Sequence, residues 1–67
     1  MGIALTKLTQ RIREEFEEAP GLRLTIREGA RFWGLYERTC EQVLARLCAA
    51  GFLSRGADER YRLVSGR

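Results

Sequence analysis

The sequence predicts a small, mainly helical α+β domain, with three helices packed beside a short β-sheet. Three observations predict this fold. Apolar residues recur at three- and four-residue steps over residues 5–19 and again over residues 37–50, which is typical of amphipathic helices. Between these stretches, Thr25 and Glu28 make the T-x-x-E pattern of a capping box. After Gly51, two short strand-like stretches flank turn residues, as in a β-hairpin.

The first helix is predicted over residues 5–19. It ends before Pro20 and Gly21, because proline disfavours helical geometry at the preceding residue. Its apolar stripe consists of Leu5, Leu8, Ile12, Phe16 and Ala19. Four glutamates gather near its end, where negative charge opposes the helix dipole: Glu14, Glu15, Glu17 and Glu18.

A second helix is predicted from about Ile26 to Trp33. These two residues share one helix face with Ala30, so the neighbouring Phe32 must point elsewhere. Phe32 either lies over the first helix or marks a patch for self-association or for a partner. Gly34 then allows the chain to turn with a positive φ angle.

The third helix is predicted over residues 37–50, with an apolar face of Cys40, Val43, Leu44 and Leu47. Gly51 would end it in a Schellman motif, with Phe52 folding back on Leu47. Cys40 and Cys48 lie about 12 Å apart along this helix, at about 1.5 Å per residue, and cannot pair with each other. We interpret Cys40 as a core residue and Cys48 as a core or half-buried residue.

The C-terminal part of the chain predicts a hairpin. Residues 52–55 and 61–64 are the strands, and residues 56–59 are turn material. The alternating stretch at residues 22–24 is expected to pair with this hairpin as an edge strand. Residues 65–67 are expected to form a frayed end.

Composition excludes several classes of function. The chain has no histidine, which removes the commonest nitrogen ligand of zinc and every Cys–His catalytic pair. No phosphate-cradling glycine loop and no metal-spaced ligand cluster is present, so we expect no enzyme activity, no cofactor and no metal. No segment is apolar enough to span a membrane and no leader pattern begins at Met1, so the cytoplasm is the expected location.

Residues 25–53 carry a recognisable series of motifs. Ala30 and Gly34 have A-x-x-x-G spacing, followed by Leu35, Thr39, Cys40 and Val43, and then by the run Leu-Cys-Ala-Ala-Gly-Phe-Leu at residues 47–53. In this order they resemble the winged helix-turn-helix DNA-binding family, which usually has Val or Ile at position 40. The resemblance implies a single domain over residues 1–67 in the order helix-strand-helix-helix-strand-strand. Its helix-turn-helix would cover residues 25–51, and its β-hairpin wing residues 52–64.

Two residues depart from the family pattern. Gly29 stands where the family prefers an apolar side chain, which predicts a gap between the motif helices that Trp33 can cover from one turn away. Tyr36 stands where Ser, Asp or Asn usually caps the second motif helix. The start of that helix is therefore expected within a residue or two of Glu37.

The resemblance implies double-stranded DNA binding, by a transcriptional regulator or by the DNA-binding domain of one. The second motif helix would enter the major groove with Arg38, Thr39, Gln42 and Arg46. The start of the first motif helix would meet phosphate through Thr25 and Arg27. The wing would contact the backbone or minor groove through Arg55, Arg60 and Arg62. The net charge of +3 agrees with this, although ordinary solvated surface charge is the alternative explanation.

Other charges oppose DNA binding. Glu37 and Glu41 lie on or near the face that would approach DNA, where an acid lowers affinity unless it accepts from cytosine. The acidic end of the first helix is expected to face away from phosphate. The alternative function is a winged-helix protein–protein interaction module of a larger assembly. A protein partner or a second copy would then bind through the Phe32 and Tyr36 region.

Overall fold

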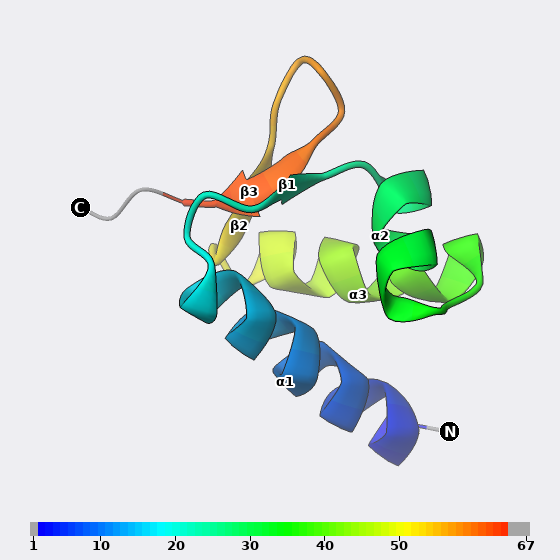
Figure 1. Ribbon diagram of the computed structural model, residues 1–67. Coiled ribbons are helices and arrows are strands. Elements are labelled where there is room, and N and C mark those ends of the chain that lie inside the picture. Colours follow the sequence, from blue (N-terminus) through cyan, green and yellow to red (C-terminus); the bar gives the residue numbers. More distant parts are fainter. Residues whose placement is uncertain (1, 65–67) are drawn as a thin grey trace.

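The computed structural model describes residues 2–64, which form three helices and one three-stranded antiparallel sheet (Figure 1). The elements are α1 (Gly2–Glu18), β1 (Arg23–Leu24), α2 (Ile26–Trp33), α3 (Glu37–Ala49), β2 (Leu53–Arg55) and β3 (Tyr61–Leu63). The predicted α+β class and the order of the elements are confirmed. The predicted frayed end at residues 65–67 lies outside the described residues.

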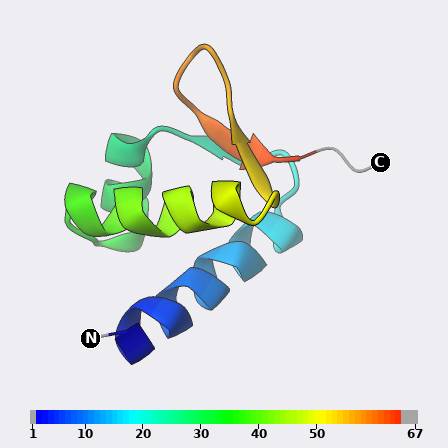
Figure 2. The same cartoon turned by 180° about the vertical axis from the view of Figure 1, so that it is seen from behind.

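The helix α3 lies between α1 and the sheet, as both views show (Figures 1 and 2). The strand order is β1-β3-β2, with β3 in the centre and both pairings antiparallel. Leu24 pairs with Tyr61, and Leu53 pairs with Leu63. The two-residue β1 is therefore an edge strand, as predicted. The loop between β2 and β3 projects from the sheet on the side away from α1.

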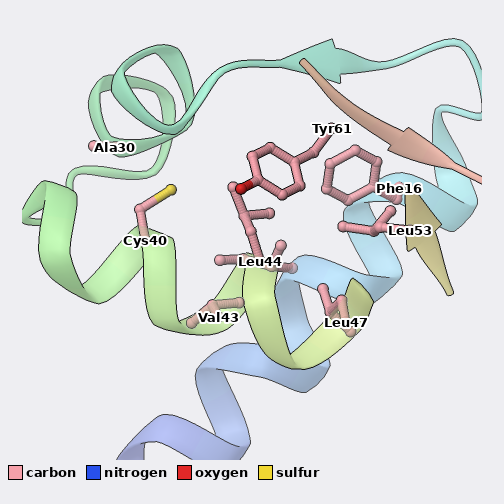
Figure 3. Close-up of a cluster of buried hydrophobic side chains, with 9 residues drawn as sticks. Phe16, Ala30, Cys40, Val43, Leu44, Leu47, Leu53 and Tyr61 are labelled. Carbon is pink, nitrogen blue, oxygen red and sulfur yellow. The ribbon is translucent and has the colours of Figure 1, made fainter. Parts of the chain in front are cut away.

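Apolar side chains from the helices and the sheet meet in one core (Figure 3). Ile12 and Phe16 of α1 and Val43 and Leu44 of α3 are fully buried. Figure 3 shows the ring of Tyr61, from β3, beside Phe16 and above α3. The core is completed by Ala30, Cys40, Leu47 and Leu53. The apolar face predicted for the third helix is therefore confirmed.

Ala19 does not belong to the stripe of α1, and its predicted place there was wrong. It is exposed and follows the last helical residue, because Pro20 disfavours helical geometry at this position. Its carbonyl accepts a hydrogen bond from the Leu22 N–H at 2.9 Å, which turns the chain toward β1. At its other end α1 begins at Gly2, three residues earlier than predicted.

Both ends of α2 are closed by local hydrogen bonds. The Thr25 hydroxyl accepts from the Glu28 N–H at 3.0 Å, and the Glu28 carboxylate accepts from the Thr25 N–H at 2.9 Å. This is the predicted capping box. After the helix, Gly34 has a φ of 68°, and the Leu35 N–H donates to the Ala30 carbonyl at 2.8 Å. These bonds satisfy backbone groups that helix ends otherwise leave unpaired.

The helix α3 begins where the sequence predicted, although its cap residue Tyr36 makes no side-chain hydrogen bond. At its C-terminal end Gly51 has a φ of 78°. The Phe52 N–H donates to the Leu47 carbonyl and the Gly51 N–H to the Cys48 carbonyl, both at 2.9 Å. Together they are the two bonds of a Schellman motif, so this predicted helix end is confirmed.

The contact between α2 and α3 is filled at Gly29, where the sequence suggested a gap. A Cβ placed on Gly29 would lie 2.8 Å from Cζ3 of Trp33 and 3.0 Å from Sγ of Cys40. The Trp33 ring therefore covers Gly29 as expected, and the sulfur of Cys40 reaches the same place from α3. A side chain at position 29 would overlap both groups.

Replacing Gly29 by alanine is expected to lower the free energy of unfolding by about 1 kcal/mol. Overpacking costs about 1–3 kcal/mol and outweighs the gain of about 1 kcal/mol in helix propensity. Urea unfolding followed by circular dichroism measures the change. Gly21→Ala is the control, since nothing lies within 4 Å of a Cβ there. Equal stability of Gly29→Ala and the parent chain would contradict the packing described above.

Candidate nucleic-acid interface

The helix predicted to enter the major groove, α3, has one buried face and one exposed face. Its buried side chains are Cys40, Val43, Leu44 and Leu47. Arg38, Gln42 and Ala45 are exposed on the opposite side. Arg38 and Gln42 are one helical turn apart, so they are neighbours on the surface. Neither side chain makes a hydrogen bond or ion pair within the described part of the chain. The structure therefore brings together two free polar groups on this face.

The other two candidates on α3 lie away from the centre of that face. Thr39 is half-buried. Arg46 is exposed, but it borders a depression between α3 and α1 that is also lined by Gln10 and Arg13. Arg46 therefore lies toward α1 rather than at the centre of the exposed face of α3.

Two of the three candidate arginines on the predicted wing, which is the β2–β3 hairpin, pair with carboxylates of the same hairpin. Nη2 of Arg62 lies 3.0 Å from Oδ1 of Asp58, and Nη2 of Arg55 lies 3.7 Å from Oε2 of Glu59. Arg62 is only half-exposed, and its buried Nε has no hydrogen-bond partner among residues 2–64. Its guanidinium therefore lies back against the wing instead of projecting into solvent.

The third wing arginine, Arg60, connects the wing to α2. Its Nη2 lies 3.2 Å from Oε2 of Glu28, the residue that also closes the capping box. The hydrogen bond from the Thr25 N–H, followed by the one from Arg60, lowers the pKa of Glu28. The Arg60 N–H likewise bonds to Asp58 and, with the nearby Arg62 charge, lowers the pKa of that carboxyl. These carboxylates were not foreseen as partners of the wing arginines.

A shallow groove lies where α2, α3 and the wing meet. It is lined by Thr25, Ile26, Arg27, Glu37, Glu41, Arg55 and Glu59, so it holds three carboxylates and two guanidinium groups. Nε of Arg27 is 3.8 Å from Oε2 of Glu37, and the Thr25 hydroxyl is already used in the helix cap. The carboxylates therefore separate the wing arginines from Arg38.

The two thiols belong to the fold rather than to a reactive site. Cys40 is buried and Cys48 is half-buried, as predicted. Burial raises the pKa of Cys40 to about 11, and the negative charge of Glu37 acts in the same direction. Cys40 is therefore a protonated and poorly nucleophilic thiol at neutral pH. Across residues 2–64, no three potential metal-ligating side chains come together.

No helix in the described part of the chain has the length and apolar character needed to cross a bilayer. Comparison of the chain with models of protein families, with curated proteins and with solved structures found no match.

Glu28 predicts how stability responds to acid. Its pKa is lowered by folding, so its contribution is present above the ordinary value of 4.5 and is lost as pH falls through the folded value. Glu28→Gln should therefore be less stable than the parent at neutral pH and lose less stability between about pH 5 and pH 3. Melting temperatures over this range measure the difference. Glu41→Gln is the control, because the Glu41 carboxylate is exposed and has no ion-pair partner among the described residues. Parallel curves for Glu28→Gln and the parent would contradict the assigned role.

Proposed function

We propose that this domain binds double-stranded DNA, as a transcriptional regulator or as the DNA-binding part of one, with α3 in the major groove. The observation that carries the proposal is that Arg38 and Gln42 are exposed on the outer face of α3 and make no hydrogen bond or ion pair with residues 2–64. Arginine can donate two hydrogen bonds to O6 and N7 of guanine, and glutamine can bond N6 and N7 of adenine. Side chains near the start of such a helix are the ones that reach base edges.

The wing would contact the DNA backbone after its arginines leave their carboxylate partners and bind phosphate oxygens instead. Exposed ion pairs such as Arg55–Glu59 are worth about 0–1 kcal/mol, so a phosphate oxygen can replace the carboxylate. The displaced carboxylate remains close and repels the same phosphate. We therefore expect α3 to provide most of the sequence preference and the wing to provide weak, sequence-independent contacts.

A winged-helix protein-interaction module is the second candidate, and one observation favours it. The groove between α2, α3 and the wing holds more carboxylates than arginines, which disfavours a phosphate backbone there. Binding would then be carried by Phe32, which is 61% exposed, rather than by Arg38. The salt dependence of the affinity distinguishes the two functions. Binding to DNA releases counterions, so the affinity for DNA falls steeply as the salt concentration rises.

Selection of duplexes from a random pool, followed by titration at increasing salt, tests DNA binding. We expect the logarithm of the affinity to fall linearly with the logarithm of salt concentration, with a slope of roughly −0.9 per phosphate contact. Arg38→Ala should weaken binding to a selected duplex by about 1–3 kcal/mol and relax the preference for one base pair. Fluorescence anisotropy of a labelled duplex measures both effects.

Lys7→Ala is the matched control for Arg38→Ala, because it removes one exposed positive charge from α1. We expect the affinity of this variant to stay close to that of the parent. Failure to select any duplex at low salt would contradict DNA binding. Equal losses for Lys7→Ala and Arg38→Ala would contradict the placement of α3 in the groove.

A further inference from the structure

Phe32, near the end of α2, forms a ridge shared by two depressions in the surface. The first lies between α1 and α2 and is also lined by Leu8, Arg11 and Glu15. The second lies beside β1 and is also lined by Arg23, Leu24, Glu28, Arg31 and Arg60. An apolar ridge between two hollows that each carry a few charged groups is the shape of a surface that can interlock with a complementary one.

Phe32 is exposed and held in a defined orientation. Its ring lies edge-on to the Trp33 ring, with 5.6 Å between the centroids, and Trp33 packs in turn on the buried Phe16 at 6.0 Å. An aromatic side chain fixed in this way loses little further freedom when a partner covers it. Burying the 61% of Phe32 that water now reaches would favour association.

The depression beside β1 has an excess of positive charge. Arg23, Arg31 and Arg60 face a single carboxylate, Glu28, and that carboxylate is already paired with Arg60. Arg23 and Arg31 have no ion-pair partner within residues 2–64. This flank of Phe32 therefore suits an acidic surface.

The opposite flank of Phe32 is acidic. Glu15 lines the depression between α1 and α2, together with Arg11. Glu18 is exposed about one helical turn after Glu15, so two carboxylates and one guanidinium lie along this flank. The chain thus carries both a basic flank and its acidic counterpart on either side of one exposed aromatic residue.

We propose that two copies of this chain associate through this surface, about a two-fold axis near Phe32. Such an axis brings the same patch of both copies together, so the basic flank of each copy meets the acidic flank of the other. Phe32 packs against its counterpart at the centre, and Arg31 of each copy faces Glu15 of the other. We choose a second copy as the partner because it carries an acidic flank and a basic flank on either side of Phe32, each of which meets the opposite charge.

Self-association stands independently of the DNA-binding proposal. Arg38 and Gln42 line neither depression, so the outer face of α3 stays open in the dimer. Measurements made without DNA test the dimer alone. A dimer would in addition present two copies of α3, which is how helix-turn-helix dimers engage paired half-sites.

Sedimentation equilibrium of the full chain at low salt, without DNA, tests the interface. We expect a monomer–dimer equilibrium that Phe32→Ala shifts to monomer. Tyr36→Ala is the control, because Tyr36 is 86% exposed but lines neither depression, and this variant should dimerise like the parent. Circular dichroism establishes that each variant is folded.

A charge exchange tests the pairing of Arg31 with Glu15. Arg31→Glu and Glu15→Arg should each weaken dimerisation about tenfold or more, because like charges then face each other at both contacts. An equimolar mixture of the two variants should restore association, since opposite charges then meet at both contacts. The proposal is overturned if the two variants associate no more strongly in the mixture than each variant does alone. A parent chain that stays monomeric at every concentration also overturns it, even if it binds an acidic peptide such as polyglutamate.

Discussion

The close approach of α2 and α3 at Gly29 is the constraint on which the rest of the structure depends. The Trp33 ring and the Cys40 sulfur occupy the space that any side chain at this position would need. Trp33 also packs against Phe16, so its ring connects α2 with α1. This contact sets the orientation of α3, and with it the face that the helix presents to solvent.

Most of the charged groups around the candidate interface are already engaged with one another. Glu28 caps α2 and holds Arg60, and Asp58 accepts hydrogen bonds within the wing. A count of arginines therefore overstates the positive charge that the wing offers to a ligand. Arg38 and Gln42 are different, because helical periodicity alone places them opposite the buried face, and neither has a partner in the part of the chain that the structure describes. The proposed function rests on them for this reason.

Features encoded in neighbouring residues could be predicted from the sequence. The capping box of Thr25 and Glu28 and the apolar faces of the helices depend on spacings of three or four residues, and the structure confirms them. Contacts between distant residues could not be predicted. Arg60 and Glu28 are 32 positions apart, and no periodicity connects them. The sequence allowed Trp33 to cover the gap at Gly29, but it did not show that the sulfur of Cys40 reaches the same place from α3.

The helix contact can be measured directly by nuclear Overhauser spectroscopy on the folded chain. We expect cross-peaks from the Gly29 Hα protons to the Trp33 Hζ3 proton and to the Hβ protons of Cys40, because Cζ3 of Trp33 lies 2.8 Å and Sγ of Cys40 lies 3.0 Å from the position that a Cβ on Gly29 would take. Absence of both cross-peaks in a folded, helical chain would contradict the central claim. The outer face assigned to α3 would then lose its structural basis.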